Sequence, residues 1–167
     1  MRRFFLVFTL LSAILCATTH AQRMREGSVL LNAGPGFIRG IGMSASADYG
    51  LIDDLGPGIF TAGGMLSLRS YSNSEYINGK LNEYTINGVA LNPRATYRIP
   101  VEEDFEVFGA FMPGIFLANR NKTSIFVGLS MGVRYSISTN ISVFGEIGFS
   151  IPEHILPVFL AGISVSL

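Results

Sequence analysis

The segment SIFVGLSMGVRYSI, residues 124–137, alternates strictly between two kinds of side chain. Its odd positions, from Ile125 to Ile137, are all large and apolar or aromatic, whereas its even positions are mostly small, polar or charged. Successive side chains of a β-strand point to opposite faces, so one face of this strand is apolar. The alternation returns about eight times along the chain. Behind a secretory signal, such repeated strands are typical of a barrel that turns its apolar face to lipid.

The N-terminus has the pattern of a cleavable signal peptide, residues 1–21. Arg2 and Arg3 form a basic start, residues 4–17 form an apolar run too short to span a bilayer comfortably, and Thr19-His20-Ala21 places small residues before the expected cleavage point. Two alternatives are an uncleaved membrane anchor and a lipoprotein modified at Cys16. The latter lacks the small residue expected before the cysteine, because Leu15 stands there.

The composition of the remaining chain, residues 22–167, excludes several classes of function. Removing 21 of the 167 residues leaves 146, without Arg2, Arg3 and the only cysteine, so 10 basic residues face 12 acidic ones. A net charge of −2 predicts no nucleic-acid partner. His154 is then the only histidine, so neither a disulfide nor a metal site is expected, and no cofactor is implied. No later segment is apolar enough for a transmembrane helix.

The predicted fold is all-β: an eight-stranded antiparallel up-and-down transmembrane barrel. The strands are expected at roughly 27–37, 41–51, 58–72, 84–99, 105–117, 124–137, 141–150 and 155–167. Each approaches or exceeds the ~9–11 residues that a tilted strand needs to cross the hydrocarbon. The outward residues of the first, second and last strands are expected to be Val29, Leu31, Ala33, Pro35 and Phe37; Ile41, Met43, Ala45, Ala47, Tyr49 and Leu51; and Ile155, Pro157, Phe159, Ala161, Ile163, Val165 and Leu167.

The connections differ in character at the two ends of the barrel. Residues 52–57, 100–104 and 138–140 are tight turns and are assigned to the periplasmic end, which also holds both termini. The outer connections 38–40, 118–123 and 151–154 are short, but the fourth, 72–84, is long.

The long connection is expected to be a protruding hairpin, because Asn78-Gly79 favours a type I′ turn. That turn pairs Ile77 with Lys80 and Arg69 with Gly88, in agreement with the alternation. A mobile loop of the same length is the alternative. The hairpin side chains that would meet a partner include Tyr76, Ile77, Lys80 and Tyr84.

Five aromatic residues are assigned to a periplasmic girdle, because amphipathic rings prefer the bilayer interface. Three tyrosines stand two residues before the ends of even-numbered strands, and two phenylalanines begin odd-numbered strands: Tyr49, Tyr97, Tyr135, Phe60 and Phe105. The alternative is a set of unrelated strand tyrosines, which are common in β-proteins.

The inward face is expected to carry a charge network, with Asp48, Arg69, Arg94, Arg98, Glu106, Arg134 and Glu146. A barrel of eight strands is too narrow for a water channel, so its buried charges must pair. We expect the pairs Arg98–Glu106 and Arg134–Glu146. The network either fills the lumen or forms a narrow polar passage or ligand-binding lumen. Phe108, Phe116, Phe126 and Phe144 also point inward and favour a filled interior.

Four prolines lie within the expected strands at outward positions: Pro35, Pro93, Pro113 and Pro157. Proline cannot donate to a sheet ladder, and a closed barrel has no free edge. Pro93 and Pro113 lie near mid-strand and are expected to mark bulges.

The chain resembles the small eight-stranded outer-membrane barrels of the OmpA/OmpX-like group, a porin-family type of β-barrel domain, over nearly all of residues 22–167. The C-terminal Gly162-Ile163-Ser164-Val165-Ser166-Leu167 looks like the last-strand signal of that group, although Leu167 replaces the usual aromatic residue and Leu160 stands at an often polar position. The resemblance implies outer-membrane lipid and the assembly machinery as partners, a monomer, and roles in surface protection, adhesion or envelope integrity.

Four functions follow from these observations. The leading one is a non-enzymatic bacterial outer-membrane barrel that displays the hairpin at 72–84 to an unknown surface partner. A lipid-modifying enzyme would use Ser150, Glu153 and His154 as a nucleophile, acid and base. A soluble lipocalin-like carrier would need the opposite sidedness, with a polar exterior. A small pore would need a wider barrel or unpaired interior charges.

Overall fold

The computed structural model describes residues 24–38, 40–77, 80–119, 122–151 and 155–167, so the expected signal peptide lies outside the described residues. These residues form eight antiparallel strands: β1 (Val29–Ile38), β2 (Gly40–Leu55), β3 (Gly58–Ile77), β4 (Lys80–Pro100), β5 (Phe105–Ala118), β6 (Lys122–Ser136), β7 (Ile141–Ile151) and β8 (Phe159–Ser166). Each strand pairs with its sequence neighbour. Nothing in this part of the chain is a helix long and apolar enough to cross a membrane.

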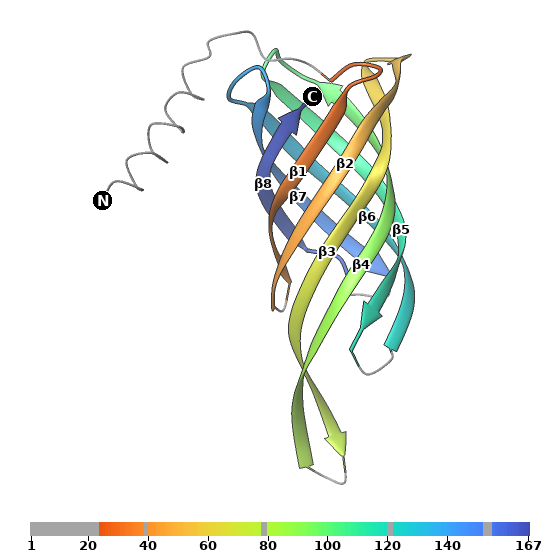
Figure 1. The fold of residues 1–167 in the computed structure, drawn as a ribbon, viewed down its shortest axis with the longest axis vertical. Helices are drawn as coiled ribbons and strands as arrows, with labels where there is room; N and C mark the ends of the chain where they lie inside the picture. Colours follow the sequence, from red (N-terminus) through yellow and green to blue (C-terminus); the bar gives the residue numbers. More distant parts are fainter. Residues whose placement is uncertain (1–23, 39, 78–79, 120–121, 152–154) are drawn as a thin grey trace, which may run out of the picture.

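The sheet closes between β1 and β8, as an up-and-down barrel requires. Leu30 pairs with Ser166, and the backbone of Val29 exchanges hydrogen bonds of 3.3 and 2.9 Å with Leu167, so the last residue of the chain completes the closure. The predicted eight-stranded antiparallel barrel is therefore confirmed. In Figure 1 the C-terminus and the tight turns lie at one end of the barrel, opposite the long β3–β4 hairpin.

Residues that alternate in character along the sequence also alternate between buried and exposed positions in the structure. In β7, for example, Phe144, Glu146, Gly148 and Ser150 are buried, whereas Val143, Ile147 and Phe149 are exposed. Because the inward positions are the polar ones on most strands, the interior collects the charges and the outer wall collects the aliphatic side chains. This is the opposite of the arrangement in a water-soluble barrel.

Apart from the strands of the long hairpin, two strand ends differ by four residues from the sequence expectation. β2 continues to Leu55 with register shifts between Gly50 and Ile52 and between Ile52 and Leu55, so bulged strand replaces part of the expected 52–57 turn. The remaining turn is Gly56-Pro57, in which Gly56 has a φ of 71°, a conformation that glycine adopts at little cost.

The last strand begins at Phe159, not at 155 as expected. Ile155 and Pro157, expected to point outward, are buried, and Leu156 between them is only 1 % exposed. Pro157 cannot donate to the β7 ladder, so the apolar run before it is free to fold inward and the strand starts after it.

Pro93 and Pro113 interrupt a ladder without forming the expected bulges. Pairing between β4 and β5 stops at Leu91↔Ile115 and resumes at Ala95↔Phe111 in the same register, which places the two prolines opposite each other. The two backbone N–H groups that the prolines lack therefore belong to a single cross-strand pair. The ladders on their other sides are continuous, with Gly64↔Pro93 and Pro113↔Val127.

The β3–β4 hairpin projects well beyond the barrel wall (Figure 1). The pairing of β3 with β2 ends at Gly40↔Tyr71, but its pairing with β4 continues to Ile77↔Lys80. Both predicted pairs, Ile77↔Lys80 and Arg69↔Gly88, are confirmed by this register. Asn78 and Gly79, on which the turn prediction rests, lie outside the described residues.

Candidate functional site

The interior charges come from five strands and meet toward the end of the barrel that holds the tight turns. Asp48 lies on β2, Arg94 and Arg98 on β4, Glu106 on β5, Arg134 on β6 and Glu146 on β7, each at an inward position. All six side chains are buried. Since a buried charge is costly unless it is paired and hydrogen-bonded, the arrangement of their partners decides whether this interior is stable.

Five ion-pair contacts link these six residues into one continuous network. Arg98 contacts Asp48 through Nη2 at 2.6 Å and Glu106 through Nη1 at 2.7 Å. Glu106 also accepts a bond of 2.7 Å from Arg134 Nη2. Arg94 reaches Glu146 at 2.9 Å and Asp48 at 3.8 Å. Three carboxylates thus balance three guanidinium groups, and the network is electrically neutral.

The expected Arg98–Glu106 pair is formed, whereas the expected Arg134–Glu146 pair is wrong. Arg134 lies directly opposite Glu106 in the β5–β6 register and bonds to it, while Glu146 lies opposite Gly132 and bonds to Arg94. Direct cross-strand neighbours are closer than diagonal ones, which explains the choice of Arg134. Arg94 belongs to β4 and Glu146 to β7, so their contact crosses the lumen between strands that are not neighbours.

Phe108 fits between two of the cations in this network. Its ring centroid lies 5.6 Å from the guanidinium carbon of Arg94 and 5.0 Å from that of Arg98. These distances are within the range of cation–π attraction. Phe108 therefore fills the lumen and stabilises the two guanidinium groups.

A chain of polar side chains, which is not predicted from the sequence, connects the network to the closure of the barrel. Ser164 on β8 donates to Asn32 Oδ1 at 2.6 Å, and Asn32 Nδ2 donates to Ser46 Oγ at 2.9 Å and to Asp48 Oδ2 at 3.4 Å. Because β1 and β8 pair through these positions, the hydrogen bonds join the two ends of the sheet.

The other half of the lumen is closed by an apolar plug. Its largest buried members come from the strands and from the β7–β8 connection: Met65, Met112, Phe116, Phe126, Phe144, Ile155, Leu156 and Leu160. Ser150 Oγ accepts bonds of 3.2 Å from the backbone N–H groups of both Ile155 and Leu156. Leu156 packs against Gly128, where a larger residue would leave no room for it. The connection is thereby folded into the barrel as part of the plug.

Arg69 belongs to the predicted set of lumen charges but does not join the network. It is 7 % exposed and lies six residues along β3 from Gly63, the residue opposite Arg94. Six residues of extended strand span about 20 Å. Its Nε and Nη2 atoms are buried and have no hydrogen-bond partner among the described residues.

The residues of the expected girdle lie where the strands meet the tight turns. Phe60 pairs with Tyr97, and Phe105 pairs with Tyr135, so the rings form cross-strand neighbours. Tyr49 and Tyr135 are exposed, and the other three are half-buried. The Tyr97 hydroxyl donates to the Leu55 carbonyl at 2.6 Å, which fixes the bulged end of β2.

The hairpin residues named from the sequence lie beyond the last pairing of β3 with β2. Tyr76 is 75 % exposed, Lys80 is exposed, and Tyr84 is half-buried against the apolar plug. On the β5 side, pairing ends at Gly88↔Ala118. Beyond it, Asn119 donates to the carbonyls of Asn87 and Thr85 and accepts from the Asn87 N–H through Oδ1. Over its described tip, the hairpin is therefore a two-stranded ribbon with two strand edges.

The outer wall is apolar across the middle of the barrel. Exposed side chains there include Leu31, Leu66, Leu91, Ile115, Leu129, Val133, Ile147, Phe149 and Ile163. In the described part of the chain, the exposed charged residues lie at the strand ends, in turns or on the hairpin: Arg25, Glu26, Asp53, Lys80, Glu83, Glu102, Glu103 and Asp104. A charge-free band therefore separates the two ends of the barrel.

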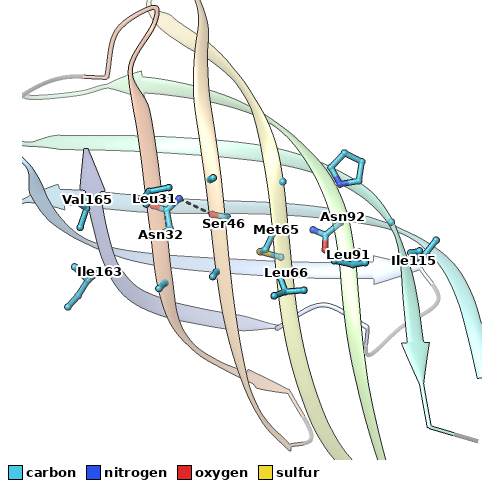
Figure 2. A pocket seen from close by; sticks show the side chains of 16 residues that line it. Leu31, Asn32, Ser46, Met65, Leu66, Leu91, Asn92, Ile115, Ile163 and Val165 are labelled. Carbon is cyan, nitrogen blue, oxygen red and sulfur yellow. Dashed lines mark hydrogen bonds between the residues drawn. The ribbon is translucent and has the colours of Figure 1, made fainter. Parts of the chain in front are cut away.

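Within this band, small residues leave a shallow apolar depression that runs from β8 to β5 (Figure 2). Ala33, Ala45, Ala47 and Gly64 belong to its lining. The larger apolar residues that line it are labelled in Figure 2: Leu31, Leu66, Leu91, Ile115, Ile163 and Val165.

Of the three residues of the enzyme hypothesis, the structure describes Ser150. Ser150 is buried and holds the plug segment through its hydroxyl, as described above. Glu153 and His154 lie outside the described residues. Within the described ranges, no group of three or more His, Cys, Asp or Glu side chains is placed to hold a metal ion.

No protein-family model matches the chain, and no curated protein matches it either. Among solved structures, the chain is similar to Ail, the attachment invasion locus protein of Yersinia pestis. The identity is 10 %, the alignment covers 85 % of this chain and 99 % of that one, and the TM-score is 0.47.

Proposed function

We propose that this chain is a non-enzymatic bacterial outer-membrane β-barrel of the OmpA/OmpX-like kind, which anchors a surface hairpin. The observation that carries the proposal is sidedness: Asp48, Arg98 and Glu106 are buried in the lumen, while side chains such as Leu129 and Ile163 are exposed on the wall. Monomeric soluble proteins rarely expose contiguous apolar patches larger than a few hundred Å². A closed barrel satisfies every backbone group internally and is one of the two structures that can span a bilayer.

The barrel would be held at a fixed depth by two features of its outer surface. The charge-free band would lie in the hydrocarbon, and the rings of Tyr49, Tyr97 and Tyr135 would lie at the periplasmic interface with Phe60 and Phe105. Export would depend on the N-terminal signal at 1–21. Insertion would depend on the assembly machinery, which would recognise the last strand, β8, and its end at Leu167.

The proposed role of the lumen is structural. The neutral ion network closes one half and the apolar plug closes the other, so the interior resembles a packed core. A soluble lipocalin-like carrier is not favoured, because it needs a hollow apolar interior and a polar exterior. A porin is not favoured either, because a barrel of eight strands leaves room only for its own side chains.

The displayed element would be the β3–β4 hairpin, which would serve surface, adhesion or envelope-integrity roles. Its outward positions include the exposed residues Ser74, Tyr76, Leu81 and Glu83. A strand edge offers unpaired backbone donors and acceptors to an extended segment of a partner, and an exposed aromatic residue such as Tyr76 adds contact area.

Cell fractionation followed by electrophoresis tests the membrane assignment. We expect the protein in the outer-membrane fraction, resistant to extraction by carbonate. An unheated sample should migrate differently from a heated one, because a closed barrel resists detergent until it is boiled. Recovery in the soluble periplasm without detergent would contradict the proposal and would revive the carrier.

A further inference from the structure

Arg69 stands near the outer rim of the lumen in a row of small residues. Its cross-strand partners are Gly42, the third residue of β2, and Gly88, which pairs with Ala118 at the end of β5. Gly42 in turn pairs with Gly36. Arg69 is therefore the one large side chain at this level of β1 to β5. Its side chain is buried, and within the described ranges it forms no ion pair with the acidic residues of the network.

The guanidinium of Arg69 has an unused binding edge. Nε and Nη2 are both buried, and in the part of the chain that the structure describes neither has a hydrogen-bond partner. These two nitrogen atoms form the edge that grips a carboxylate or phosphate through two parallel hydrogen bonds. The structure leaves this edge unpaired, whereas the guanidinium groups of Arg94 and Arg98, farther along the lumen, each contact carboxylates.

The balance of charge in the lumen points to the same site. Asp48, Glu106 and Glu146 are matched by Arg94, Arg98 and Arg134, which leaves Arg69 as the excess cation among the described inward residues. A buried and unpaired charge is strongly destabilising, so an anion that pairs with it should bind favourably.

The side chains near Arg69 are uncharged: Ser44 and Ser67, which bond to each other at 2.8 Å, lie on one side, and aromatic residues lie on the other. Phe116 lies against Gly88, and Tyr71 occupies the next inward position along β3. Tyr71 and Tyr84 both pack against the plug. In the described part of the chain, no carboxylate forms an ion pair with Arg69.

We propose that Arg69 is a binding site for a single oxyanion, a carboxylate or phosphate group, that enters from the outer end of the barrel. The anion would take two hydrogen bonds from Nε and Nη2. Because both atoms are covered, binding includes a displacement of side chains at the rim. The oxyanion would be either a free ion or the headgroup of a lipid, and the chemistry of the contact is the same in both cases.

Nuclear magnetic resonance of the arginine Nε–H groups tests the proposal directly. The full chain would be folded in an uncharged maltoside detergent and titrated with sodium phosphate, against sodium chloride at equal ionic strength. We expect one Nε–H resonance, absent from the spectrum of Arg69→Lys, to shift with saturation. This arm does not depend on the cellular location of the protein.

Thermal unfolding provides the matched comparison between variants. Phosphate should raise the melting temperature of the wild type and of Lys80→Gln, which removes an exposed cation from the hairpin, but not that of Arg69→Gln. Arg69→Lys keeps the charge but loses the two-donor edge, and we expect about tenfold weaker binding, since a charge-assisted hydrogen bond contributes about one factor of ten.

A second arm identifies the source of the oxyanion. The same spectra would be recorded in phosphatidylcholine nanodiscs with and without phosphatidic acid. A shift with inorganic phosphate in detergent supports a free ion, and a shift only with phosphatidic acid supports a lipid headgroup. If neither probe shifts a wild-type resonance, the proposal is overturned, and this result needs no variant to fold. An equal effect of phosphate on Arg69→Gln and wild type would also overturn it.

Discussion

Arg98 and Glu106 flank the β4–β5 turn and meet as a buried ion pair, with Nη1 and Oε1 2.7 Å apart. The second amino group of Arg98 reaches Asp48 at 2.6 Å, so this guanidinium joins carboxylates from two different strands. Its side chain is only 2 % exposed. Removal of Arg98 would therefore leave two buried carboxylates short of a partner.

We predict that Arg98→Met destabilises the barrel by about 3–5 kcal/mol, the cost typical of breaking a buried ion pair on one side. The measurement is urea unfolding of the protein reconstituted in lipid vesicles. Arg25→Met removes an exposed arginine and serves as the control, with an expected change below about 0.5 kcal/mol. Equal unfolding midpoints for Arg98→Met and wild type would contradict the role given to the network.

The plug segment should loosen when its hydrogen-bond acceptor is removed. Ser150→Ala takes away the oxygen that accepts from the N–H groups of Ile155 and Leu156. The expected loss is about 1–3 kcal/mol, because buried donors would be left unpaired. Hydrogen exchange at these two amides should accelerate. Ser130→Ala is the matched control, since the Ser130 hydroxyl is buried without a partner and its loss should not destabilise.

The paired prolines predict a local repair of the β4–β5 ladder. Replacing Pro93 and Pro113 together by alanine supplies both missing donors of one cross-strand pair. We expect the new amides to show slow hydrogen exchange, comparable to those of Leu91 and Ala95. Fast exchange at both new amides would show that strand separation, rather than the missing donors, interrupts the ladder.

Trypsin treatment of intact cells tests the display of the hairpin. Lys80 is exposed beyond the barrel, whereas Arg94, Arg98 and Arg134 are buried in the lumen. Cleavage should occur after Lys80 in wild-type cells, and the corresponding fragment should disappear in Lys80→Gln. If this fragment appeared only after the cells were opened, the hairpin would face the periplasm and the proposed orientation would be wrong.

Much of the fold follows from alternation because side-chain period and strand geometry are directly linked. Leu129 and Ser130, for example, are predicted to lie on opposite faces because one position is odd and the other even. In the structure Leu129 is exposed and Ser130 is buried. The hairpin register follows from one turn, Asn78-Gly79, together with the requirement that Arg69 and Gly88 share a face.

The alternation of side chains does not predict which residues contact each other across the lumen. The odd or even position of a residue indicates which face its side chain occupies, but not which strand lies opposite it across the barrel. The Arg94–Glu146 pair joins β4 to β7 and was missed for that reason. Pairs next to a turn, such as Arg98–Glu106, were accessible because the turn sets their register.

The predicted start of the last strand, residue 155, is wrong because an apolar run is compatible with both a strand and a segment that fills the lumen. Ile155 and Leu156 satisfy the pattern of a strand and also that of a plug. The choice depends on two distant residues, Ser150, which accepts their backbone donors, and Gly128, which leaves room for Leu156. Neither interaction is visible in the local sequence.

Fluorescence quenching by brominated lipid tests the central claim about sidedness most directly. The chain contains no tryptophan, so the tryptophan fluorescence of a single-substitution variant comes from the introduced residue alone. Leu129→Trp places the probe on the outer wall, and Phe126→Trp places it in the lumen three residues away. In vesicles of lipid brominated on the acyl chains, we predict strong quenching of Leu129→Trp and little quenching of Phe126→Trp. The reverse pattern, or quenching of Leu129→Trp by aqueous iodide instead of by lipid, would contradict the account.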